Sequence, residues 1–200
     1  DYRLAPENRF PAAVEDAWAA FQWAVGGKGG LAIDSQKVAV GGDSAGANLS
    51  AVVAIMARNA KMLLCFQALI YPATSFHLNT DSHEKFATGY LLTKETQAWY
   101  HEQYLRNDAD KDNWQASPAL TADLAGVAPA HVLTCGYDPL VDEGKEYVNM
   151  LKRAGVKVTH HCFRRQVHGF ITMGKVIDEA NDAVYEIADA VAREFKNITN

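Results

Sequence analysis

The 200-residue sequence predicts an α/β fold with a mostly parallel sheet, because apolar strand-like runs alternate with helical patterns along the chain. The run at residues 38–40 leads into the turn Gly42-x-Ser44-x-Gly46, and an Ala-rich helical pattern follows at once. The run at residues 65–71 is typical of a strand that is buried on both faces. The serine is therefore expected at a sharp turn between a buried strand and a helix, with glycines that leave room for the bend.

Helices are predicted on both sides of this serine turn. The first begins after Pro11 and ends at the pair Gly26-Gly27, with apolar residues at helical spacing between them. Its apolar positions are Val14, Trp18, Phe21 and Val25. The second helix follows the serine directly, and its expected buried face consists of Leu49, Val52, Val53 and Met56.

The last third of the chain repeats the alternation. Strands are predicted at residues 130–134 and 156–163, and the helix between them is expected to start at Asp142 as its N-cap and to end at Gly155. A final helix carries an apolar stripe, which we expect to face the sheet. The members of this stripe are Val184, Ile187, Ala188, Val191 and Phe195.

Residues 74–127 interrupt the alternation, because they are polar and aromatic and contain no clear strand. A long insertion at the carboxyl end of a strand lies beside the ligand site in open α/β sheets. We therefore expect this segment to border the serine. An alternative is a helical excursion that packs only its own aromatic residues.

Two further residues stand where a reactive serine would need them. Asp138 ends one predicted strand region and His168 follows the next, so the chain order is Ser44, Asp138, His168. A serine hydroxyl is a weak nucleophile, so it needs a base to take its proton and a third group to orient that base. In such a site His168 is the base, Asp138 orients it, and the main-chain N–H of Ala45 faces the developing oxyanion.

Each of these residues also has a purely structural interpretation. Ser44 could serve only as a helix N-cap, and His168 could be a loop histidine with its hydrogen bonds satisfied. Asp138 could cap the turn before Pro139, in which case Asp142 would be the acid instead. Asp138 is favoured because it comes directly after the strand, whereas Asp142 is better placed as an N-cap.

The sequence resembles the bacterial hormone-sensitive-lipase-like family of α/β-hydrolases in several motifs that follow one another in order. The matching segments are residues 1–7, 10–13, 42–46, 70–72, 138–144 and 168–170. The resemblance implies an α/β-hydrolase fold in which residues 1–200 belong to a single catalytic domain. It also implies that residues 74–127 form part of a cap, or lid, over an acyl pocket.

The chain departs from the family pattern in two places. Ala47 stands where the family usually carries a second glycine, a change that we expect to be tolerated. The family's glycine-rich oxyanion loop lies upstream of the segment that resembles residues 1–7, and the N-terminal strands lie there too. We therefore expect the sequence to be the C-terminal two-thirds of a longer protein, and the isolated piece to be impaired in activity.

The composition argues against nucleic acid and anionic membranes as partners. The net charge is −5, and the adjacent basic pairs are limited to Lys152-Arg153 and Arg164-Arg165. No run approaches the length of a membrane span, so no stable membrane insertion is expected. The three cysteines, Cys65, Cys135 and Cys162, sit in apolar runs without paired spacing, which fits a reducing cytoplasm. The other histidines lack metal-ligand spacing and no dinucleotide motif occurs, so neither a metal nor a cofactor is expected.

The function that these residues predict is a serine carboxylesterase acting on small-molecule esters with short to medium acyl chains. An amidase or deacetylase would use the same three residues, because acyl transfer does not reveal the leaving group. A small-molecule receptor on the same fold is a second alternative, although such receptors characteristically lack one of the three side chains. The oligomeric state stays open, with a homodimer among the alternatives.

Overall fold

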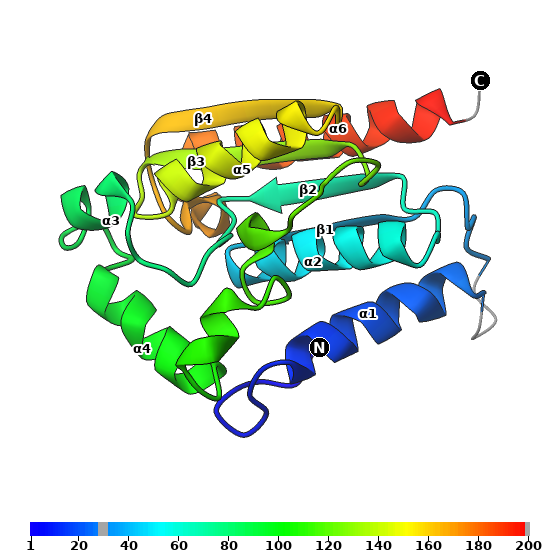
Figure 1. Ribbon diagram of the computed structural model, residues 1–200. Coiled ribbons are helices and arrows are strands. Elements are labelled where there is room, and N and C mark those ends of the chain that lie inside the picture. The colour runs from blue at the N-terminus through cyan, green and yellow to red at the C-terminus, as the bar shows by residue number, and fades with distance from the viewer. Residues whose placement is uncertain (28–31, 199–200) are drawn as a thin grey trace.

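The computed structural model describes residues 1–27 and 32–198, and its centre is a parallel sheet of four strands (Figure 1). The strands are β1 (Ala39–Asp43), β2 (Phe66–Ile70), β3 (Ala130–Tyr137) and β4 (Val158–Val167), and they lie side by side in that order. The predicted α/β class is confirmed. β1, β3 and β4 continue beyond the apolar runs because their polar and glycine residues still pair with the neighbouring strand.

Helices cover both faces of the sheet (Figure 1). On one face, α2 (Ala45–Asn59) and α5 (Val141–Arg153) share a core with alternate residues of β2 and β3. On the other face, α6 (Asp178–Asn197) packs against the intervening residues of the same strands. The outermost helix, α1 (Ala12–Val25), lies against α2 rather than against the sheet. β2 is therefore buried on both faces, as its sequence predicts.

The apolar stripe predicted for α6 is partly wrong. Val184 is 48% exposed and Ala188 also faces solvent, whereas Ala180, Ala183 and Ala190 are buried. Small side chains occupy the contact face because they let the helix lie close to the sheet. Alanine is a weak signal in a hydrophobic pattern, so the sequence favoured the larger residues beside it.

The start of α5 corrects a second expectation. Leu140 occupies the N-cap position, and Asp142 is the second residue inside the helix. The turn is instead closed by Asp138, whose Oδ1 accepts a hydrogen bond of 2.9 Å from the main-chain N–H of Leu140. The helix ends near Gly155, as predicted, and this glycine has a φ of +77°.

Residues 74–127 contain helices and turns but no strand. Two helices, α3 (Asp81–Lys85) and α4 (Lys94–Tyr104), are followed by 3₁₀ turns at Asp108–Asp112 and Pro118–Leu120. Thr93 caps α4 by accepting a 3.0 Å hydrogen bond from the N–H of Thr96. Both helices lie near the edge of the sheet where the strands end (Figure 1).

The turn between β1 and α2 is tight and strained. Ser44 has a φ of +53°, a conformation that costs a non-glycine residue about 1–3 kcal/mol. The two flanking glycines differ: a Cβ on Gly42 would lie 2.5 Å from the carbonyl carbon of Gly46, whereas a Cβ on Gly46 would meet no atom within 4 Å. Only Gly42 is therefore required by the close approach of strand and helix.

A second close approach lies beside the end of β3. A Cβ on Gly136 would lie 2.0 Å from the main-chain oxygen of Arg164 in β4. The pairing of β3 with β4 shifts register between Cys135 and Tyr137, next to this glycine. The irregularity lets β3 run on to Tyr137, so that Asp138 leaves the sheet directly at its edge.

The two glycines of the serine turn yield a direct test. Gly42→Ala should lower the free energy of unfolding by at least about 2 kcal/mol, because the added methyl group collides with main-chain atoms. Gly46→Ala is the matched control and should be neutral or slightly stabilising, since alanine favours the helix. Urea unfolding measures both, and equal midpoints for the two variants would contradict this account of the turn.

Candidate active site

Three side chains singled out by the sequence meet at one edge of the sheet. Ser44 follows β1, Asp138 follows β3, and His168 follows β4, each directly at the end of its strand. Because the strands are parallel, their carboxyl ends lie on the same side of the molecule. The topology therefore brings together residues that are 30 and 124 positions apart in the chain.

His168 connects the other two side chains through both of its ring nitrogens. Nε2 lies 2.8 Å from Ser44 Oγ, and Nδ1 lies 2.7 Å from Asp138 Oδ2. Because an ionised carboxylate can only accept, Nδ1 carries the proton and Nε2 is left as the acceptor for the serine hydroxyl. The Ser44 side chain makes no capping hydrogen bond to α2, although it occupies the N-cap position. Its hydroxyl is therefore available to the imidazole.

The acid and the base of this arrangement are shielded from water. Asp138 is fully buried and His168 is 8% exposed. Burial strengthens the hydrogen bond between them, since less water competes for it. The second oxygen of Asp138 accepts the Leu140 N–H described above, so both carboxylate oxygens have partners.

Tyr71 packs against the His168 ring and bonds the residue before Ser44, a role that the sequence did not reveal. Its ring centroid lies 4.5 Å from that of His168, and its hydroxyl donates a 3.1 Å hydrogen bond to Asp43 Oδ2. Burial, with the Asp43 carboxylate adding to it, raises the pKa of the Tyr71 phenol far above its ordinary value. Tyr71 thus stays a neutral donor and links the serine turn to the imidazole. Its position directly after β2, at the same sheet edge, was the available signal.

Ala45 is the first residue of α2. The N–H groups of the first helical turn have no acceptor within the helix, and they carry the positive end of its dipole. The N–H of Ala45 is next to Ser44 in the chain. An anion that forms on an atom bonded to Ser44 Oγ would therefore find a donor here.

Asp142, the alternative acid, has a different partner. Its Oδ2 accepts a 2.9 Å hydrogen bond from the main-chain N–H of Ser82 in α3. Among the described residues, Asp138 is the carboxylate that bonds the ring of His168.

The remaining histidines have structural surroundings. His160 and His161 leave opposite faces of β4, as predicted for neighbours on a strand, and bond Thr134 and Glu186 respectively. Burial lowers the pKa of His101, which lies against Phe76, to about 4. Within residues 1–27 and 32–198, no cluster of three or more His, Cys, Asp or Glu side chains could hold a metal ion, and no helix could cross a membrane.

A cavity of about 580 Å³ lies away from the three residues. Arg9, Phe76, His101 and Leu105 are among its lining residues, whereas Ser44 and His168 are not. Among its lining cations, Lys111 pairs with Asp108 and Arg106 with Asp110. The lining of this cavity therefore includes none of the three side chains at the sheet edge.

Comparison with known proteins agrees with the geometry. A family model described as the alpha/beta hydrolase fold matches residues 1–172. A carboxylic ester hydrolase of Mycobacterium tuberculosis, LipN, is 45% identical over 180 residues, which cover 86% of this chain and 48% of that protein. An ethyl acetate hydrolase of Pseudomonas putida is 36% identical over 97% of this chain and 62% of its own length.

Solved structures show the same similarity. An esterase of Pyrobaculum calidifontis superposes with a TM-score of 0.92 at 42% identity, over 96% of this chain and 64% of that one. EstE1, a carboxylesterase cloned from a metagenomic library, gives a TM-score of 0.93 at 40% identity, over 97% and 67%. The chain thus spans about half to two-thirds of the length of these relatives. It belongs to the α/β-hydrolase fold family, among the hormone-sensitive-lipase-like esterases.

Proposed function

We propose that this chain carries the catalytic residues of a serine carboxylesterase, with Ser44 as nucleophile, His168 as general base and Asp138 as the group that orients the base. The observation that carries the proposal is the pair of hydrogen bonds in series from Ser44 through His168 to Asp138. The named carboxylic ester hydrolases among its relatives support an ester as the substrate. The Pseudomonas relative is named for ethyl acetate, which supports a preference for short acyl chains.

The first half of the reaction transfers the acyl group to the enzyme. Ser44 Oγ attacks the ester carbonyl carbon while its proton passes to His168 Nε2, and the carbonyl π electrons move onto the oxygen. Asp138 stabilises the imidazolium that forms without taking its proton. When the tetrahedral intermediate collapses, the bond to the alcohol oxygen breaks and Nε2 protonates that oxygen.

The second half repeats these steps with water. His168 Nε2 takes a proton from the water as the water oxygen attacks the acyl carbon. When this second intermediate collapses, the bond from the acyl carbon to Ser44 Oγ breaks, Nε2 returns the proton to Oγ, and the carboxylic acid leaves. In both halves, the negative oxygen faces the N–H of Ala45. A single oxyanion donor is typically worth about 2.7–4 kcal/mol of transition-state stabilisation.

Residues 74–127 are proposed to form part of the cap beside the acyl pocket. Tyr90 stacks on Tyr137 with ring centroids 5.4 Å apart, next to Asp138. Leu91 is exposed and approaches Gly169, the neighbour of His168: a Cβ on this glycine would lie 3.8 Å from Leu91 Cδ2. These contacts with the chain neighbours of Asp138 and His168 support the assignment of this segment to the cap.

Replacing the nucleophile tests the proposal. Ser44→Ala should abolish hydrolysis of p-nitrophenyl butyrate, with a loss of at least about 10⁴-fold in kcat. Ser50→Ala is the matched control, because that hydroxyl donates to the Gly46 carbonyl within the same helix and should leave the rate nearly unchanged. Retained turnover in Ser44→Ala would refute the assignment of the nucleophile.

A covalent probe keeps this test valid if turnover is slow. An activated aryl phosphonate should label the chain once, at Ser44, and mass spectrometry should locate the adduct. An initial burst of p-nitrophenol from the butyrate ester would likewise distinguish an enzyme from a receptor that only binds. Faster cleavage of the matching p-nitroanilide than of the ester would instead identify an amidase.

A second prediction separates the two candidate acids. Asp138→Asn should lower kcat by about 10⁴-fold, because an amide at this position stabilises the wrong imidazole tautomer. Asp142→Asn, which alters only the bond to Ser82, should cost far less. Steady-state kinetics on p-nitrophenyl butyrate compare them, and a larger loss of kcat at position 142 would overturn the choice of Asp138.

A further inference from the structure

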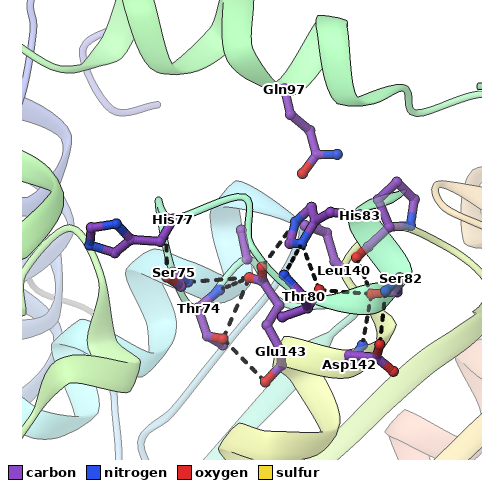
Figure 2. Close-up of polar contacts among 12 residues, drawn as sticks. Thr74, Ser75, His77, Thr80, Ser82, His83, Gln97, Leu140, Asp142 and Glu143 are labelled. Atoms are coloured by element: carbon purple, nitrogen blue, oxygen red, sulfur yellow. Dashed lines mark hydrogen bonds and ion pairs between the residues drawn. The ribbon is translucent and has the colours of Figure 1, made fainter. Parts of the chain in front are cut away.

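Glu143 lies at the centre of a buried polar network (Figure 2). The network contacts the loop of residues 138–140 between β3 and α5, which we name the acid loop because it carries Asp138. It is the third residue of α5, five positions after Asp138, and it is only 4% exposed. Its Oε1 accepts main-chain N–H bonds of 2.5 Å from Thr74 and 3.2 Å from Ser75, where the chain has just left β2. The carboxyl group thus ties the first turn of α5 to the start of the 74–127 segment.

The other oxygen of Glu143 faces a buried histidine. Oε2 lies 3.4 Å from Nε2 of His83, which is fully buried in α3. Neither atom makes a hydrogen bond of good geometry to any described residue. Two buried polar atoms without partners are costly, and a single proton between them would satisfy both. Gln97 extends from α4 toward the same histidine (Figure 2). Side chains of α3, α4 and α5 therefore meet at this point.

A chain of hydrogen bonds leads from His83 back to the acid loop. We call it the relay: His83 Nδ1 lies 2.6 Å from Thr80 Oγ1, Thr80 Oγ1 lies 3.0 Å from Ser82 Oγ, and Ser82 Oγ donates to the Pro139 carbonyl at 2.6 Å. Pro139 directly follows Asp138. Ser82 also holds Asp142 through its main-chain N–H, so this short helix is fixed to the acid loop at two points.

The direction of the relay is set at its end. A carbonyl oxygen can only accept a hydrogen bond, so the single proton of the Ser82 hydroxyl is donated to Pro139. The Ser82 oxygen must therefore accept a hydrogen bond from the Thr80 hydroxyl. Thr80 therefore accepts from Nδ1–H of His83. The main-chain N–H of Thr80 also lies 3.4 Å from Nδ1, but a contact of that length contributes little beside one of 2.6 Å. A neutral His83 then has an acceptor at Nε2, and the donor that faces it is Glu143.

Charge and burial favour the same protonation state. Burial raises the pKa of Glu143 to about 8, the nearby Asp138 carboxylate adds to this, and the N–H donors of residues 74 and 75 oppose it. Burial also lowers the pKa of His83, and Lys94 on α4 adds to that shift. The side chain of Gln97 opposes it, and so do the carboxylates of Asp138 and Asp142. A protonated Glu143 beside a neutral His83 therefore avoids placing an unpaired charge in the interior.

We propose that protonated Glu143 is a positioning residue for Asp138, acting through the relay that ends at the Pro139 carbonyl. It holds the loop between β3 and α5 in the place where Asp138 meets His168. The inference rests on the proposed function, because it assigns Glu143 to the same catalytic arrangement. It concerns geometry rather than contact with substrate, so its loss should lower kcat more than it changes KM.

Two substitutions distinguish a proton donor from a required anion. Glu143→Gln keeps an acceptor for Thr74 and Ser75 and an N–H donor for His83, so kcat at neutral pH should stay within about threefold of the parent chain. Glu143→Ala removes both and should lower kcat by about 10- to 100-fold with little change in KM. Ser82→Ala, which breaks the relay together with a long 3.4 Å bond from the Asp142 N–H, should lower kcat in the same manner. Equal damage from Gln and Ala in folded protein would overturn the proposal.

The pH dependence of stability gives a readout that is independent of catalysis. Because the pKa of Glu143 rises from 4.5 to about 8 on folding, its contribution is full below 4.5 and is lost as the pH rises through 8. Glu143→Gln has no carboxyl proton to lose. The difference between its thermal midpoint and that of the parent chain should therefore shift in favour of the variant as the pH rises from 4.5 to 8. Glu146→Gln, on the exposed face of the same helix, is the control and should show no such trend. A constant difference for Glu143→Gln would reject the protonated form.

The combined outcomes separate the two proposals. If the parent chain neither hydrolyses p-nitrophenyl butyrate nor reacts with the phosphonate, the proposed function fails, while the thermal midpoints still decide whether Glu143 is protonated. If the parent chain is active and its kcat falls above pH 8 no more steeply than that of Glu143→Gln, the function stands and the role of Glu143 is refuted.

Discussion

The imidazole of His168 must hold two hydrogen bonds at once, and much of the surrounding structure serves to keep its two partners in place. Ser44 and Asp138 come from strands that are not adjacent, since β2 lies between β1 and β3. The parallel sheet, with its strands in register, brings both side chains to one edge. The buried strands and the helices on both faces make that edge rigid, because a close-packed interior permits few alternative arrangements.

Strain at this edge is offset by the stability of the same scaffold. Ser44 and Tyr71 both have positive φ values, +53° and +36°, and each costs about 1–3 kcal/mol. The Ser44 N–H donates to the Ile70 carbonyl at 2.9 Å and the Tyr71 N–H to Leu133 at 2.7 Å, so neighbouring strands hold both residues. The strain aims the Ser44 hydroxyl at the imidazole and sets the Tyr71 ring against it. A looser scaffold would relax both residues away from these positions.

Patterns that are local in the sequence predicted much of this arrangement. The strand, turn and helix around Ser44 lie within one short segment, and Asp138 and His168 each follow a strand, so their meeting follows from topology alone. The prediction of the buried face of α6 was partly wrong, because Ala180 and Ala183 make the contact with the sheet while the larger Val184 faces solvent. Asp142 was misplaced because cap preferences act on single turns, whereas the bond from Ser82 that fixes it comes from 60 residues away.

The network around Glu143 shows why such contacts escape sequence reasoning. Nothing near residue 143 indicates that its carboxyl group is buried; the neighbouring charges suggest an exposed first turn, where acidic residues are common. Its burial follows from α3, which closes over α5 only when the 74–127 segment folds back. That segment therefore supplies a structural support for the loop that carries Asp138. A change in its hydrogen bonds alters the position of Asp138 without touching any group that reacts.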